Sequence, residues 1–156
     1  MSIKITEIEH CDEQLVKAFA RLAPQLSENA PLPTAERLQR IIDTPTSHLL
    51  AAVTDDGTIA GVLTLVFFDI PTYCKAWIED VITDAQYRGQ GIGKTLLKSL
   101  AKIAVSEGCG RLEWACLDWN EPSIEFYRAQ GAVSMDEWTT YRLTGDALTS
   151  FAADEV

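Results

Sequence analysis

The residues best suited to chemistry form a glycine-rich segment near the middle of the chain. It runs from Val81 to Thr95 and reads VITDAQYRGQGIGKT. A strand-like apolar stretch precedes the glycines and a helix-like stretch follows them. Such a junction points several backbone N–H groups and the positive end of the helix dipole, about half an elementary charge, at one spot. The segment therefore predicts a phosphate-binding loop.

Two common phosphate-binding motifs each fail in this loop at one position. A Walker A loop ending in Gly-Lys-Thr would need glycine where Arg88 stands. A dinucleotide-binding G-x-G-x-x-G loop that started at Gly89 would need glycine where Lys94 stands. The failed Walker pattern disfavours a nucleotide-hydrolysing switch. A third pattern, R-x-x-G-x-G, fits Arg88, Gly91 and Gly93 without exception.

A second motif lies about thirty residues further on. Residues 120–132 read NEPSIEFYRAQGA, and the spacing of Asn120, Ser123 and Tyr127 places all three on one face of a helix. The two motifs, in this order, resemble those of the GNAT superfamily of N-acetyltransferases. That family has a Q/R-x-x-G-x-G/A loop between a strand and a helix, and an N-x-x-A/S-x-x-F/Y-Y-x-x-x-G segment. The resemblance covers residues 47–143.

The resemblance implies acetyl-CoA as cosubstrate and no metal. In this family the strand before the loop pairs with pantetheine and polarises the thioester carbonyl, and the loop holds the pyrophosphate. The implied cofactor-binding residues are Val81, Ile82, Thr83, Arg88, Gly89, Gln90, Gly91, Ile92, Gly93, Lys94, Thr95, Asn120, Ser123 and Tyr127. Arg88 as an ordinary surface charge and Asn120 as a helix cap are the alternatives.

Two carboxylates, Glu79 and Asp80, lie in the strand that leads into the loop. An amine acceptor must lose a proton, so these residues are candidates for the base or its water relay. Adjacent side chains of a regular strand point to opposite faces, so only one can face the substrate unless a bulge intervenes. Resemblance to the polyamine enzymes favours Glu79 as the relay to water and Asp80 as a contact to the cation. The alternative is a solvent-facing pair without a catalytic part.

Tyr127 is the candidate acid, because the family uses this position to protonate the departing thiolate. A tyrosine hydroxyl of pKa about 10 protonates a thiolate of pKa about 8.5 only when it is held close. A tyrosine that only packs is the alternative. Within the family, residues 78–80 and 118–123 look most like the diamine and polyamine (spermidine/spermine type) acetyltransferases.

The elements that must position these residues alternate in type. Periodicity predicts strands over 3–8, 47–54, 58–68, 76–83 and 111–117, with one or two more over 133–143. It predicts helices over 15–26, from Thr34 to Pro45, over 93–106 and over 121–130. The fold class is α/β (α+β), with one domain over 1–156. The resemblance implies a central mixed, mostly antiparallel twisted sheet of six to seven strands, flanked by about four helices.

Composition excludes several kinds of partner. The chain has 13 Lys and Arg against 23 Asp and Glu, a net charge of −10, which argues against nucleic acid and anionic membranes. Its longest apolar run, 60–68, falls short of the ~20 residues of a membrane span. The N-terminus shows no secretory signal, so a cytoplasmic location is expected.

Cysteines, histidines and tryptophans predict no further chemistry. The four cysteines form no C-x-x-C pair and are expected to be free thiols. The two histidines have no zinc-ligand spacing. The four tryptophans are expected in the core.

The sequence thus predicts an acetyl-CoA-dependent N-acetyltransferase that acts directly on a small, cationic primary amine. One alternative enzyme acetylates a protein or peptide amine. A noncatalytic acyl-CoA-binding module is the alternative outside enzymes. Because GNAT proteins are often dimers, the resemblance also implies a homodimer.

Overall fold

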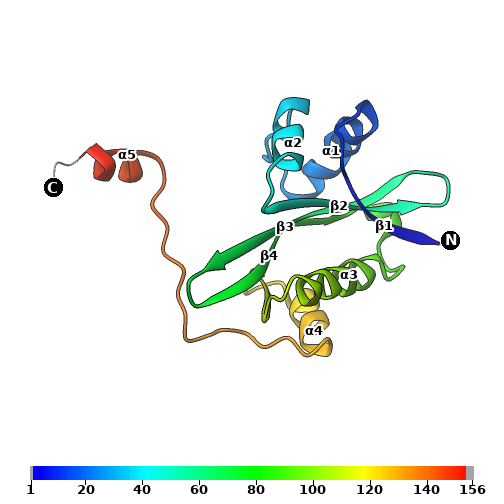
Figure 1. Ribbon diagram of the computed structural model, residues 1–156. Coiled ribbons are helices and arrows are strands. Elements are labelled where there is room, and N and C mark those ends of the chain that lie inside the picture. The colour runs from blue at the N-terminus through cyan, green and yellow to red at the C-terminus, as the bar shows by residue number, and fades with distance from the viewer. Residues whose placement is uncertain (1, 154–156) are drawn as a thin grey trace. The chain divides into compact units, whose positions relative to one another are not determined.

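The computed structural model describes residues 2–153, which divide into two compact units. The first unit ends at Ala115 and the second begins at Cys116. The first contains a sheet with three α-helices, and the second contains two α-helices (Figure 1).

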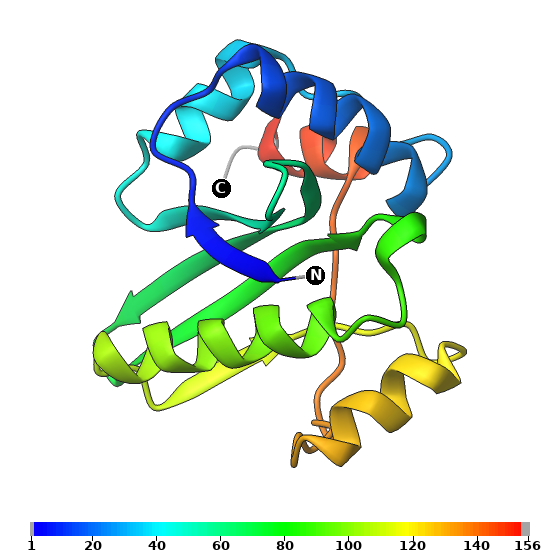
Figure 2. The ribbon, with the colours of Figure 1, turned by 90° about the vertical axis from the view of Figure 1, so that its right-hand side faces the viewer.

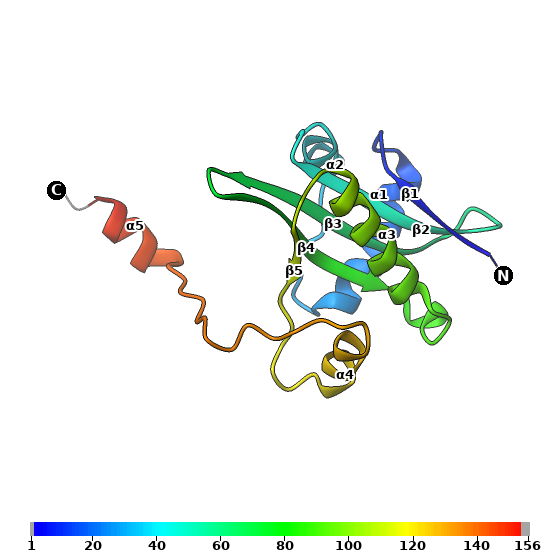
Figure 3. The same cartoon turned by 60° about the horizontal axis from the view of Figure 1, so that its bottom comes forward.

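The sheet of the first unit has five strands, which lie side by side in chain order. They are β1 (Ile3–Glu7), β2 (Ser47–Thr54), β3 (Ile59–Ile70), β4 (Tyr73–Thr83) and β5 (Arg111–Trp114). Neighbouring strands from β1 to β4 are antiparallel, while β4 and β5 are parallel (Figure 3). The predicted fold class, an α/β fold with a mixed and mostly antiparallel sheet, is confirmed.

Helices cover both faces of this sheet (Figures 1 and 2). Helices α1 (Glu13–Leu26) and α2 (Ala35–Ile42) pack on one face, and α3 (Ile92–Ser106) packs on the other. Strand side chains alternate between the faces, so the adjacent residues Leu49 and Leu50 enter different buried clusters. Leu49 joins the α1–α2 cluster and Leu50 joins the α3 cluster.

Local signals fixed most of these elements. Thr34 caps α2 by accepting a hydrogen bond from the Arg37 N–H at 3.1 Å, as its residue type predicts. The turn at Gly57 (φ 84°) joins β2 and β3 in an antiparallel hairpin. Helix α1 continues past Pro24 and ends at Leu26, where the predicted helix also ends.

The strands predicted over 133–143 are wrong. The described residues there form no strand, and the second unit contains α4 (Glu121–Ala129) and α5 (Gly145–Ala153). Within residues 2–153 the sheet therefore has five strands rather than six to seven, and with α5 there are five α-helices rather than about four. β5 also ends at Trp114 instead of continuing to 117. An alternating pattern shows which side chains share a face, but a strand exists only where a partner strand supplies hydrogen bonds.

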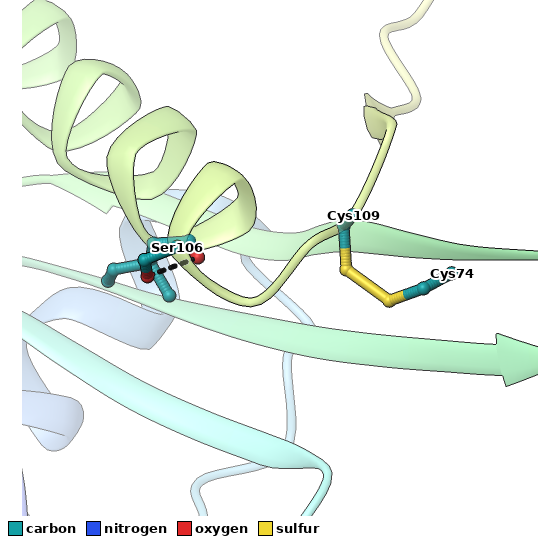
Figure 4. The surroundings of a disulfide bond; sticks show 4 residues. Cys74, Ser106 and Cys109 are labelled. Carbon is teal, nitrogen blue, oxygen red and sulfur yellow. Dashed lines mark hydrogen bonds between the residues drawn. A yellow bond between two sulfur atoms is a disulfide. The ribbon is translucent and has the colours of Figure 1, made fainter.

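The prediction of four free thiols is wrong for two cysteines. Cys74 and Cys109 form a disulfide with a Cα–Cα distance of 4.7 Å (Figure 4), while Cys11 and Cys116 are free. The parallel pairing of Lys75 with Arg111 brings the two cysteine-containing segments together. Cys74 and Cys109 are 35 residues apart, so their spacing alone gives no sign of this contact.

The tryptophans do not form a common core. Trp77 and Trp114 are half-buried, but Trp119 and Trp138 are each 77% exposed. The core prediction is therefore wrong for the two tryptophans of the second unit. Their residue type favours burial, but no element of their own unit encloses them.

Candidate active site

The glycine-rich loop forms the junction that its sequence predicts. After β4, the short 3₁₀ helix η1 (Ala85–Tyr87) leads to Arg88, and α3 begins at Ile92. Gly89 and Gly91 have φ angles of 76° and 79°, a region that favours glycine. Gly91 is the N-cap of α3 and provides no side-chain cap. The first-turn amides of α3 are thus open to an anion, at the positive end of the helix.

The side chains of the loop fit a negatively charged ligand. Arg88 and Lys94 are exposed, and the Arg88 Nε donates a hydrogen bond to the Thr83 carbonyl at 3.2 Å. Ile92 is buried in the α3 cluster and anchors the helix start. Cationic side chains therefore accompany the open amides, which is the combination that a pyrophosphate group requires.

A β-bulge in β4 brings out the two candidate carboxylates. Thr64 of β3 pairs with Glu79, but Val62 pairs with Ile82, so β4 has one residue more than β3 between these pairs. Asp80 takes up the difference with a φ of 53°. Both carboxylates are exposed. The bulge that would let both of them reach a substrate is therefore present.

The bulge also shifts the alternation of β4 side chains, so that residues beyond it point to the opposite face of the sheet from the one expected. Ile78 and Ile82 are four residues apart and would share one face of a regular strand. Instead, Ile78 lies in the α3 cluster and Ile82 lies in the α1–α2 cluster. The bulge is thus fixed by burial on both sides of the sheet.

One edge of β4 is left open beside the bulge. β5 pairs with β4 only from Lys75 to Ile78, and beyond that point residues 79–83 have no ladder partner on this side among the described residues. Their outward backbone N–H and C=O groups are available to an extended ligand. This open edge leads directly into the glycine loop.

The surroundings of the two carboxylates differ. Glu79 accepts a hydrogen bond from the Trp77 indole N–H at 2.8 Å, which orients its side chain. Partial burial raises the pKa of the Asp80 carboxyl, and the neighbouring charge of Glu79 raises it further. Asp80 is therefore a stronger base than an ordinary aspartate.

Four side chains near the predicted site residues were not predicted to have a role in the site: Trp77, Arg21, Gln25 and Asp84. Arg21, Gln25 and Asp84 hydrogen-bond with one another or with the backbone at the start of the loop. Asp84 gave one signal, since aspartate before a turn often accepts a backbone N–H bond. Arg21 and Gln25 gave none, because they are about sixty residues away in sequence.

In the second unit, α4 holds the remaining predicted residues. Asn120 is its N-cap and accepts a hydrogen bond from the Ser123 N–H at 3.4 Å, so it has the capping role. Asn120, Ser123 and Tyr127 are all half-buried, whereas Glu121 and Glu125 are exposed. Burial, followed by the nearby Cys116 thiol, raises the pKa of the Tyr127 hydroxyl. Tyr127 thus keeps its proton to higher pH than an ordinary tyrosine.

Residues 2–153 lack two features. No group of three His, Cys, Asp or Glu side chains has the arrangement of a metal site. No helix within this range is long and apolar enough to cross a membrane.

Comparison with known proteins identifies the family. The model of the acetyltransferase (GNAT) family matches residues 13–132. An L-ornithine N5-acetyltransferase of Arabidopsis thaliana is 43% identical over 97 residues, or 60% of this chain and 42% of that protein. A thialysine N-epsilon-acetyltransferase of Caenorhabditis elegans is 32% identical over 146 residues, or 90% of each chain. The chain spans less than half of the Arabidopsis protein's length.

A solved structure agrees with these sequence matches. An integron cassette protein of Vibrio cholerae has a TM-score of 0.81 and 28% identity, covering 99% of both chains. The fold and the glycine-rich loop agree with the family match. The chain belongs to the acetyltransferase (GNAT) family, so the resemblance predicted from its two motifs is confirmed.

Proposed function

We propose that this enzyme transfers the acetyl group of acetyl-CoA directly to a primary amine of a small, cationic acceptor. The β4 bulge is the observation that carries the proposal. It exposes the consecutive carboxylates Glu79 and Asp80 on the strand that runs into an anion-binding loop. The proposal includes one acetyltransferase domain over 1–156, supported by a family match that crosses the boundary at Ala115.

The open edge of β4 and the glycine-rich loop bind different parts of acetyl-CoA. Backbone groups of Val81, Ile82 and Thr83 pair with pantetheine and polarise the thioester carbonyl. Arg88 and the amides of residues 89–94 hold the pyrophosphate, with Thr95 at the end of the first helical turn. The exposed cations and uncapped helix start support this assignment. The resemblance to the family assigns Asn120 and Ser123 of α4 to cosubstrate binding as well.

The carboxylates provide the base. A primary amine with a pKa near 10.4 needs roughly 4 to 5 kcal/mol to lose its proton at pH 7. Glu79, oriented by Trp77, relays this proton through water, and Asp80 contacts the cationic acceptor. The raised pKa of Asp80 also allows it to take the proton itself.

Tyr127 provides the acid. The amine nitrogen attacks the thioester carbon, an N–C bond forms and the C–S bond breaks. The amine proton passes to the carboxylate side, and the Tyr127 hydroxyl gives its proton to the departing thiolate. No covalent enzyme intermediate is needed. The raised pKa of Tyr127, caused first by burial, keeps the hydroxyl protonated for this step.

The acceptor class is supported by charge and by the named relatives. A chain with a net charge of −10 attracts cations rather than anions. The relatives' names specify the N5 amine of L-ornithine and the N-epsilon amine of thialysine. Together with the polyamine-like segments at 78–80 and 118–123, these names favour an amine on a short aliphatic chain.

Two further features belong to the proposal. Resemblance to the family supports a homodimer, which light scattering of the purified protein would test. A cytoplasmic location is proposed from the same resemblance. The Cys74–Cys109 disulfide is uncommon for that compartment. Counting free thiols in protein isolated under acid quench would show whether the disulfide exists in the cell.

Free-thiol release from acetyl-CoA tests the activity. The acceptors would be spermidine, putrescine, ornithine, lysine, thialysine, amino sugars, aminoglycosides and short peptides. Turnover with an aliphatic diamine or polyamine is expected. Turnover only with peptides would favour the protein-acetylating alternative. CoA binding without turnover of any amine would favour the noncatalytic module. Glu79→Gln and Asp80→Asn variants would show whether the bulge carboxylates are needed.

A further inference from the structure

A polar network joins α1 to the first residues of the glycine loop. The Arg21 Nε donates to the Asp84 Oδ2 at 2.8 Å, and the same guanidinium donates to the Ile59 carbonyl at 2.5 Å. One turn further along α1, the Gln25 Oε1 accepts a hydrogen bond from the Ala85 N–H at 2.8 Å. Two residues of one helix thus hold the point at which β4 ends.

Asp84 is the centre of this network. It is 3% exposed, and with Thr54 it is one of two buried polar side chains among the described residues. The Asp84 N–H donates to the Ala60 carbonyl at 2.9 Å, and its Oδ1 accepts from the Gln86 N–H at 3.1 Å. A carboxylate is stable at such a depth only when it is paired and hydrogen-bonded. Asp84 meets both conditions, so its position is closely fixed.

The network ends on backbone groups at the base of the loop. The Ile59 carbonyl belongs to the first residue of β3, and the Ala85 and Gln86 N–H groups belong to η1. Arg88 follows Asp84 by four residues, and its Nε returns to the Thr83 carbonyl at 3.2 Å. The start of the loop is therefore held from both sides before Gly89 and Gly91 turn the chain into α3.

We infer that Arg21, Gln25 and Asp84 are positioning residues for the pyrophosphate-binding loop. They act through Arg88 and the amides of residues 89–94, which they hold in the binding arrangement before the cosubstrate arrives. This inference rests on the proposed use of acetyl-CoA. Rigid placement of a binding loop improves affinity because less ordering is needed on binding.

The inference makes a selective prediction. The loop contacts pyrophosphate, while pantetheine pairs with the edge of β4. A displaced loop should therefore weaken ligands that contain pyrophosphate and leave a ligand without it unaffected. Acetyl-CoA and S-acetylpantetheine form such a pair. A general loss of stability would not separate them.

The experiment compares Arg21→Met and Asp84→Asn with Lys17→Met, which removes an exposed ion pair with Glu13 on the same helix. CoA affinity is measured by calorimetry, and kcat and KM are measured with both acetyl donors. We expect both network variants to weaken CoA about tenfold, or about 1.4 kcal/mol. KM for acetyl-CoA should rise while kcat at saturation holds, and kcat/KM for S-acetylpantetheine should stay within about twofold. Lys17→Met should match the unmodified protein.

Other results would overturn the inference. If the folded network variants bind CoA as tightly as the unmodified protein, the positioning role is wrong, while the proposed function still stands. Equal losses with both donors would show a general structural role instead. No CoA binding by the unmodified protein would overturn the proposed function and this inference with it. If Asp84→Asn does not fold, Gln25→Ala is expected to give a smaller loss in the same direction. This variant removes the contact to the Ala85 N–H together with the Gln25 hydrogen bonds to Asp84 and to the Arg21 carbonyl, and it keeps the Arg21–Asp84 ion pair.

Discussion

The unit that ends at Ala115 and the unit that begins at Cys116 treat apolar side chains differently. Among the described residues, every buried apolar side chain belongs to the first unit, where two clusters fill both faces of the sheet. Helices α4 and α5 have no buried residue. The large exposed apolar residues of the second unit are Leu117, Trp119, Val133, Met135, Trp138, Tyr141, Leu143, Leu148 and Phe151.

This contrast shows that the proposed functional residues of the two units have different physical support. A large apolar side chain gains about 1.5 to 3 kcal/mol from full burial, and those of the second unit forgo most of it. The loop and the bulge adjoin buried apolar clusters, whereas Tyr127 lies on α4, which has no buried residue. Truncation of an apolar side chain should therefore lower stability much more in the first unit than in the second.

A matched pair of leucines gives the largest expected effect. Leu96 in α3 is 1% exposed and Leu148 in α5 is 49% exposed. Leu96→Ala should lower the free energy of unfolding by about 2 to 5 kcal/mol, because it leaves a cavity. Leu148→Ala should change it by less than about 0.5 kcal/mol. Urea unfolding of both variants measures the difference, and similar losses would contradict the contrast.

Tyr127→Phe tests whether a residue of the second unit contributes to kcat. It removes the proposed proton donor and keeps the ring, so kcat should fall about 100-fold or more. Acetyl-CoA affinity should change less than about twofold. Rapid-quench kinetics would establish that chemistry limits turnover. Tyr141→Phe, at a tyrosine that is 91% exposed, is the control. An unchanged kcat under these conditions would remove Tyr127 from the acid role.

Arg88→Ala should affect binding rather than chemistry. Loss of one charge-assisted contact to pyrophosphate should weaken CoA about tenfold. Arg37→Ala, at an exposed arginine on α2, removes the same charge elsewhere and should leave the affinity unchanged. Fluorescence or calorimetric titration gives both values. Equal CoA affinity in the Arg88 variant would contradict its pyrophosphate role.

The smallest expected effect concerns acid stability. Burial alone would raise the pKa of Asp84, but hydrogen bonds from the Gln86 N–H, Arg21 and Gln25 hold it below its usual range. The folded state therefore binds fewer protons than the unfolded state. This contribution is fully present above about pH 3.9 and is lost as the pH falls through the folded pKa. Asp84→Asn should flatten the loss of stability below pH 4, as measured by urea unfolding against pH.

The local parts of the site could be predicted from the sequence. Glycines at 89 and 91, an uncapped helix start and the Asn120 cap depend on residues within a few positions of one another. The family match has the same origin, because it follows from two short motifs. The predicted element order up to α4 was right for this reason.

Long-range features could not be predicted in this way. The sequence indicated only that both carboxylates could face the substrate if the strand contained a bulge. The position of the bulge depends on which strand side chains are buried in each of the two clusters. The disulfide joins residues 35 positions apart, and Arg21 meets Asp84 across 63 positions. The strands predicted over 133–143 failed because alternation cannot supply a partner strand.

The sequence by itself determined that the chain has a glycine-rich loop at the start of a helix, a capped helix with a tyrosine and a carboxylate pair on a strand. Backbone dihedral preferences and capping bonds decide such features locally. Only the tertiary structure decided that both carboxylates reach solvent, that β4 keeps an open edge and that α1 holds the start of the loop. These depend on strand pairing and burial, which combine residues from distant parts of the chain.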